Sequence, residues 1–163
     1  MSYPVDEKKW PRVREMLERH DLDALVVRAP DNILYLTNYW TMKGYDLVIF
    51  PRDGDPTLLV IEPQFREAER TAWNKDVRFF RFYDAKDPRP PMVRAVEMAV
   101  DVLGERKLDA RVGIELSQFS QICDRMVGEP TVYWQGYYDA FRSRCREVID
   151  AAPLLADVDA IGE

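Results

Sequence analysis

The chain has 163 residues, 47% of them hydrophobic, which suits a single domain with a proper core. Its 23 basic and 29 acidic side chains give a net charge of −6, which argues against nucleic acid as the main partner, because a phosphate-binding face needs an excess of Lys and Arg. No apolar run approaches the roughly 20 residues of a membrane span, and the N-terminal sequence lacks the apolar segment of a signal peptide, so we expect a cytoplasmic protein without a membrane partner.

Helices and strands are predicted to alternate along the chain. Residues 6–20 have the spacing of an amphipathic helix, and residues 22–27 that of a short buried strand. Two apolar runs at 45–50 and 57–62, joined by a turn rich in Pro, Asp and Gly, predict a hairpin. The remaining predictions are a helix at 63–73, a strand at 76–84, a Pro-rich loop at 84–91, a helix at 91–107, a strand at 111–116, helices at 117–128 and 135–146, and a strand within 147–155 that leads into a short helical turn.

This order predicts one domain over residues 1–163, of the α/β class. Helices that alternate with buried strands cover both faces of a sheet, and the local hairpin adds antiparallel pairing to it. We therefore expect three layers, with a mixed β-sheet between two layers of helices.

The segment DNILYLTNYW, which follows the first predicted strand, continues no strand pattern. Asp31 is a suitable N-cap for a short helical turn. Asn38 is suited to end that turn in a left-handed backbone conformation. We expect the turn to bury its three apolar side chains, Ile33, Leu34 and Leu36.

The chain is poor in the side chains that build metal and redox sites. Cys123 and Cys145 are the only cysteines, and in a cytoplasmic domain we expect them to be free thiols. His20 is the only histidine, and its place at the end of a predicted helix favours a capping or surface role. A catalytic zinc, iron or manganese site normally takes more than one imidazole or a close group of cysteines. We therefore expect no metal site in this chain.

Sequence motifs of catalysis are missing as well. No glycine-rich phosphate loop follows a strand, and no GxSxG nucleophile turn occurs. Acidic pairs such as Asp53 and Asp55 fall in predicted turns, where they are explained as turn formers. By elimination, the chain is predicted to have no catalytic residue of its own.

Several segments, in their order and spacing, resemble the N-terminal domain of the creatinase, aminopeptidase P and prolidase superfamily. These segments are LDALVV, APDNILYLTNY, YDLVIF, RDGDP, TLLVIE, RVGIEL and VIDAAPLLADVDAI, and they span nearly the whole chain. The chain departs from the family at Asn38, where glycine is usual, and at Asp159 and Gly162, where the family has arginine and lysine.

The resemblance implies a ribonuclease H-like α/β fold and a module that is not itself catalytic. In this superfamily a separate C-terminal domain, absent from this chain, carries the chemistry of a hydrolase such as an Xaa-Pro peptidase. That domain holds two divalent ions (Mn, Zn or Co) on two Asp, one His and two Glu, whereas creatinase works without metal. The implied partners are that catalytic domain and a second copy in a homodimer, and the implied role is to support oligomers and wall the active site.

The resemblance also indicates which residues form the wall, namely the loop that follows the YLT segment. Aromatic side chains with one cation beside a glycine suit a substrate's apolar body and its carboxylate. In the alternative interpretation, Trp40 packs on its own domain and Lys43 is solvated. The candidates that face substrate or an interface are Tyr39, Trp40, Thr41, Met42, Lys43, Gly44 and Tyr45.

Two further groups stand out from the rest of the chain. Arg78 and Arg81 lie in a predicted strand, where pairing with acidic residues across the sheet is expected. The aromatic cluster at 133–138 fits a domain or subunit interface and a local core equally well. Two other functions remain open, a free-standing α/β module that binds a small molecule at its strand ends and a scaffold.

Overall fold

The computed structural model describes residues 4–42, 45–116 and 135–160. Within these ranges the helices are α1 (Lys9–Arg19), α2 (Pro30–Thr37), α3 (Phe65–Thr71), α4 (Pro91–Glu105), α5 (Gln135–Arg144) and α6 (Ala152–Ala160), with one 3-10 turn, η1 (Glu62–Gln64). The strands are β1 (Ala24–Val27), β2 (Leu47–Pro51), β3 (Thr57–Ile61), β4 (Asp76–Phe80), β5 (Arg111–Ile114) and β6 (Glu147–Asp150).

The strands form one mixed sheet in the order β4-β3-β2-β1-β5-β6. β2 runs antiparallel to both of its neighbours, β1 and β3, and these two pairings include the predicted hairpin. The other three pairings are parallel. β1, β2 and β3 are buried along their whole length, because helices cover both faces of the sheet, and this explains why they read as continuous apolar runs.

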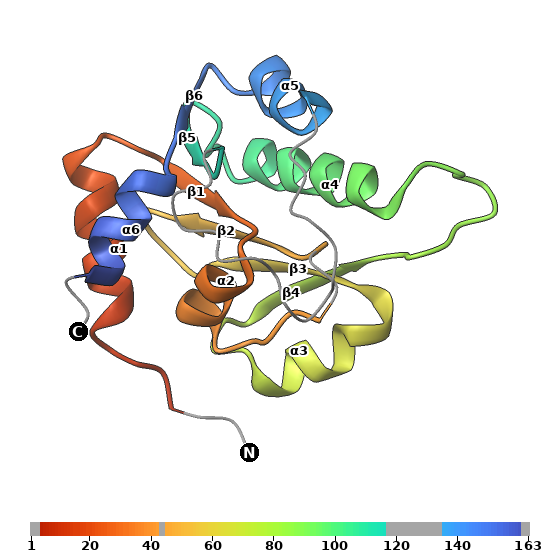
Figure 1. Ribbon diagram of the computed structural model, residues 1–163, viewed down its shortest axis with the longest axis horizontal. Helices are drawn as coiled ribbons and strands as arrows, with labels where there is room; N and C mark the ends of the chain where they lie inside the picture. The colour runs from red at the N-terminus through yellow and green to blue at the C-terminus, as the bar shows by residue number, and fades with distance from the viewer. Residues whose placement is uncertain (1–3, 43–44, 117–134, 161–163) are drawn as a thin grey trace.

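Side chains alternate between two cores, one on each face of the sheet. In β1, Ala24 and Val26 point into the core beneath α4 and α5, whereas Leu25 and Val27 point into the core beneath α1, α2, α3 and α6. Figure 1 shows the two helical layers on opposite sides of the strands. We refer to these sides as the α4–α5 face and the α1–α6 face. The predicted three-layer α/β fold with a mixed sheet is confirmed.

The helical turn at residues 30–37 follows the prediction in part. Asn38 has φ 60° and ψ 13°, so the predicted left-handed end is confirmed. The prediction that Asp31 is the N-cap is wrong, because α2 begins at Pro30, two residues earlier than an N-cap at Asp31 implies. Proline suits the first helical position, and its place makes Ala29 the N-cap. Ile33 and Leu36 are fully buried, and Leu34 is half-buried.

Other elements differ from the predictions mainly at their ends. The strand predicted at 76–84 stops at Phe80, and the one predicted at 111–116 stops at Ile114. The helix predicted at 63–73 is divided into η1 and α3, and the strand predicted within 147–155 ends at Asp150 before α6. The helix predicted at 117–128 lies outside the described residues.

Candidate functional site

The ends of several strands lie together along one side of the sheet, which we call the strand-end edge. β1, β5 and β6 are parallel and end at this edge, and β2, which is antiparallel to β1, begins there. The connection from α2 to β2 therefore runs along the strand ends. We refer to its described part, residues 38–42 and 45–46, as the edge loop. It contains most of the candidate residues identified in the sequence.

Side chains of the edge loop alternate between the interior and the surface. Tyr39 and Thr41 are buried, with exposed fractions of 1% and 2%. Trp40 and Met42 are exposed, at 43% and 58%. The hydroxyl-bearing side chains Tyr39 and Thr41 thus face inward, whereas Trp40 and Met42 face outward.

Asp46, fully buried at the end of the edge loop, explains this alternation. One of its carboxylate oxygens accepts hydrogen bonds from the Tyr39 hydroxyl at 3.2 Å and the Thr41 hydroxyl at 2.6 Å. The other oxygen accepts the backbone N–H of Ile61, at the end of β3, at 3.0 Å. A single carboxylate thus ties the loop to the sheet.

Burial dominates the electrostatics of Asp46. Desolvation raises its pKa from 3.8 to about 6, although the hydrogen bonds from Thr41, Ile61 and Tyr39 act in the opposite direction. Burial, followed by the nearby charge of Asp46, raises the pKa of Tyr39. The phenol therefore stays protonated and serves as a donor to the carboxylate.

Asp46 was missed among the sequence candidates, although its sequence carries a signal. A carboxylate directly before the apolar run LVIF lies at the start of a buried strand. A buried charge needs hydrogen-bond partners, so such a residue is expected to hold neighbouring polar groups. The hydroxyls that it holds come from two of the predicted wall residues, Tyr39 and Thr41.

Glu115, a second fully buried carboxylate, follows β5 at the same edge. It accepts the backbone N–H groups of Arg28 and Ala29 at 2.6 and 2.8 Å, and the side-chain amide of Asn32 at 2.5 Å. These groups surround the N-terminal end of α2, where a negative charge is favoured. Burial raises the pKa of Glu115 against the effect of these bonds. Its partners give it a structural role.

The remaining wall candidates are placed as follows. Tyr45 is half-buried, and its ring centroid lies 6.2 Å from that of Phe82. Lys43 and Gly44 lie outside the described residues. Trp40 packs only partly on its own domain, because 43% of this residue is exposed.

Arg78 has a structural role and Arg81 lies beyond the strand. The Arg78 guanidinium donates to Asp76 at 3.1 Å and to Glu105 at 2.9 Å. The prediction of pairing across the sheet is wrong for Arg78, because its acidic partners belong to the same strand and to α4. Arg81 follows β4 and approaches Asp84 at 4.0 Å.

The other candidates from the sequence are also structural. Tyr137 is fully buried and packs edge-on against Phe141, with ring centroids 5.1 Å apart, which favours the local-core interpretation for this part of the aromatic cluster. His20 is the C-cap of α1, as predicted. Cys145 is a free, buried thiol, whose pKa burial raises to about 11. Cys123 and residues 133–134 lie outside the described residues.

Among the described residues, no three His, Cys, Asp or Glu side chains form a group that could hold a metal ion. No helix in the described ranges is both long and apolar enough to cross a membrane. The described part of the edge loop places Trp40 and Met42 at the surface, while the hydroxyl groups of Tyr39 and Thr41 are bonded to Asp46.

Comparison with known proteins shows the family of the chain. The model of the creatinase/prolidase N-terminal domain family matches residues 9–161. The chain belongs to this family. A search of curated protein sequences finds no significant match for the domain.

Solved structures of the same fold include isolated domains and whole enzymes. A proline dipeptidase structure from Streptococcus pneumoniae is similar with a TM-score of 0.66 and 20% identity, covering 99% of both chains. The N-terminal domain of the cytoplasmic peptidase PepQ from Mycobacterium tuberculosis has a TM-score of 0.62 and 13% identity, covering 93% of this domain and 96% of that chain. The prolidase from Pyrococcus horikoshii has a TM-score of 0.60 and 15% identity, covering 93% of this domain and 33% of that chain.

Because the sequence identities are only 13–20%, these similarities support the fold alone. The domain spans about one third of the P. horikoshii enzyme. The substitution of the family's glycine by Asn38 is compatible with the fold, because Asn38 adopts the left-handed conformation that the position requires. The second departure, at Asp159 and Gly162, concerns residues whose side chains are not described.

Proposed function

We propose that this domain is the non-catalytic part of a hydrolase of the Xaa-Pro peptidase type. In this proposal it packs against a catalytic domain that carries two divalent metal ions, or none if the enzyme is creatinase-like. It also supports a homodimer, and its edge loop walls the active site. One similar structure is described as a cytoplasmic peptidase, and we propose the same location for this protein.

The alternation of the edge loop carries the proposal. Trp40 and Met42 stay exposed, although the fold has two apolar cores in which such side chains are normally buried. Asp46 holds the neighbouring side chains inward and so fixes which ones face outward. Rigid, exposed apolar groups at a strand-end edge suit contact with a substrate or another domain.

Steady-state kinetics on the full-length protein that contains this domain test the proposal. We expect W40A to lower kcat/KM for Xaa-Pro dipeptides by about tenfold or more, as for loss of one aromatic contact. Its melting temperature should not change, because the side chain is half-exposed. The matched control is V5A, which removes an apolar side chain of equal exposure, 43%, outside the edge loop.

The 163-residue chain alone provides the baseline of the same experiment. It should show no hydrolysis of these dipeptides with added Mn²⁺ or Zn²⁺. Turnover by the chain alone, abolished by a chelator, would contradict the non-catalytic assignment. A W40A enzyme as active as the V5A control would contradict the role of the wall.

A further inference from the structure

The connection between β4 and α4, residues 81–90, forms a projecting arm. In Figure 1 it extends beyond the N-terminal end of α4, away from the two helical layers. An unsupported loop of this kind would be flexible, so the contacts at its base decide whether it presents a fixed surface.

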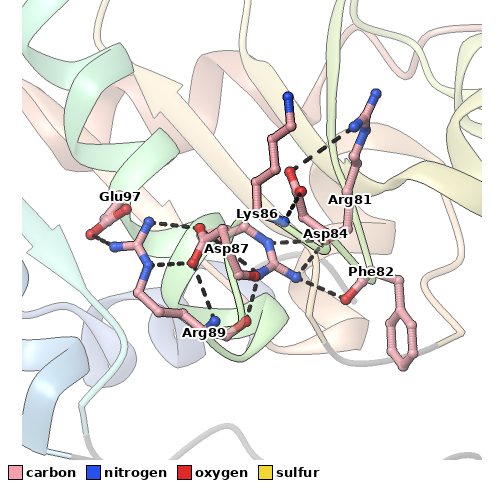
Figure 2. A network of polar contacts seen from close by, with 8 residues as sticks. Arg81, Phe82, Asp84, Lys86, Asp87, Arg89 and Glu97 are labelled. Atoms are coloured by element: carbon pink, nitrogen blue, oxygen red, sulfur yellow. Dashed lines mark hydrogen bonds and ion pairs between the residues drawn. The ribbon is translucent and has the colours of Figure 1, made fainter.

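Arg94, in the first turns of α4, braces both limbs of the arm. Its guanidinium donates to the carbonyl groups of Arg81 and Phe82 on one limb and of Asp87 and Arg89 on the other, at 2.5–3.2 Å. Figure 2 shows the polar network that joins the two limbs, with Arg81 and Phe82 on one limb and Asp87 and Arg89 on the other. All three nitrogens of the guanidinium are used, which only the fork geometry of arginine allows.

Acidic residues of the arm stiffen it further. The Asp87 carboxylate accepts two bonds from the Arg89 guanidinium, each at 2.7 Å, and these bonds lower its pKa to about 2. Arg89 also donates to Glu97 of α4. At the tip, the backbone N–H of Lys86 donates to the Asp84 carboxylate at 2.9 Å. The arm is thus a preformed element, which lowers the entropy lost on binding.

This rigid arm presents aromatic and cationic side chains to solvent. Tyr83 is 78% exposed, the most of any large hydrophobic side chain in the described residues. Phe82 is 51% exposed and packs towards Tyr45. Arg81 and Lys86 are also exposed and extend in the same direction in Figure 2. An exposed tyrosine flanked by cations is typical of an interface anchor.

A complementary surface lies on the same domain, between α4 and α5. This groove has a volume of about 410 Å³, and acidic side chains stand beside its apolar ones. Asp139 is exposed, and its carboxylate is engaged by Gln135 and by no cation among the described contacts. The groove is lined by Val93, Val96, Glu97, Gly136, Asp139, Ala140 and Ser143.

We propose that the arm of one chain docks in the α4–α5 groove of a second copy, with Tyr83 as its anchor and with Arg81 and Lys86 facing Asp139. Arm and groove adjoin the same end of α4, so a two-fold axis lets each chain offer its arm to the other. This inference rests on the homodimer of the proposed function and names its contact.

Charge favours a second copy as the occupant. The arm carries three cationic and two anionic side chains, a net charge of +1. Since the whole chain has a net charge of −6, the chain without the arm has a net charge of −7. The arm is thus complementary to the remainder of its own chain, and the dimer should weaken as salt rises.

Sedimentation velocity of the 163-residue chain over a range of concentrations tests the contact. We expect a reversible dimer, with Y83S raising its dissociation constant by about 30-fold or more, as for loss of an interface hot spot. The charge variants R81E/K86E and D139R should each dissociate the dimer. A chain carrying all three substitutions should regain it, because the charges are complementary again.

The matched control is V5S, which removes an exposed apolar side chain outside the arm, the groove and the edge loop and should leave the dimer intact. Far-UV circular dichroism should be unchanged for all variants, since these side chains are exposed. A dimer unaffected by Y83S and D139R would overturn the arm contact and leave the homodimer standing. A wild-type chain that stays monomeric would also overturn the arm contact, whereas the role of the wall is judged separately by the kinetics of W40A.

Discussion

Asp46 and Glu115 are the fully buried acidic side chains in the described part of the chain, and both lie at the strand-end edge. Each accepts three hydrogen bonds: those of Glu115 come from groups 83 to 87 residues away, and those of Asp46 come from its own loop and from the end of β3. An unpaired buried carboxylate would be strongly destabilising, so these partners are obligatory. At this scale the domain uses charge to fix loops and helix ends.

The pKa of Asp46 predicts a pH dependence of stability. Its folded value of about 6 lies above the ordinary 3.8. The stabilisation is therefore fully present below about pH 4 and is lost as pH rises through about 6. In urea unfolding, the free energy of the chain relative to D46N should fall by up to about 3 kcal/mol from pH 4 to 7. Other carboxyl groups cancel in this difference, and a difference that stays constant with pH would contradict the assignment.

Sequence reasoning reached some of these residues and not others. Asn38 was predicted because its left-handed conformation is a local backbone property. The bonds of Glu115 could not be predicted, because its partners lie 83 to 87 residues away in sequence. The nearest partners of Asp46 lie only 5 and 7 residues away, so its position before a buried strand was a usable signal that was missed. Asp31 was misassigned as the N-cap because Pro30 takes the first helical position and makes Ala29 the N-cap.

At the scale of elements, periodicity predicted the type of each described helix and strand but not its ends. The end of a strand depends on its neighbours, and β4, at an edge of the sheet, stops at Phe80 although aromatic residues continue. The order of the strands was also out of reach, since it depends on packing over the whole chain. The hairpin was the exception, because its turn residues are local.

Two glycines show that the effect of a substitution on stability depends on the packing around the residue as well as on its intrinsic propensity. A Cβ at Gly113 in β5 would lie 2.8 Å from Ala151 Cβ and 2.9 Å from Leu25 Cδ2. We expect G113A to destabilise the domain by about 1–3 kcal/mol through overpacking. A Cβ at Gly104 in α4 would meet nothing within 4 Å, so G104A should stabilise by about 0.5–1 kcal/mol. Urea unfolding of the two variants measures both, and equal effects would contradict this explanation.

At the scale of the whole molecule, one sheet separates two cores. Neighbouring residues in the central strands point into opposite cores, so neither core can lose its packing without disturbing the same strands. The two helical layers should therefore unfold together.

Thiol labelling and fluorescence can test this coupling. Cys145 lies in the core of the α4–α5 face, and Trp10 packs against the core of the α1–α6 face. In a C123S background, the urea midpoint for labelling of Cys145 should coincide with that of Trp10 fluorescence, taken as the difference from W10F. Labelling of Cys145 well before the fluorescence change would show that the α4–α5 face opens by itself.

The alternation of the edge loop has a consequence for how such domains diverge. Tyr39 and Thr41 are bonded to Asp46, so changing them disturbs the loop and the sheet. Trp40 and Met42 lie at the surface and belong to neither core, so changing them leaves the fold nearly intact. Positions under constraint thus alternate with positions free to vary. A lineage can exchange the face that it presents to a partner or substrate while keeping the same scaffold.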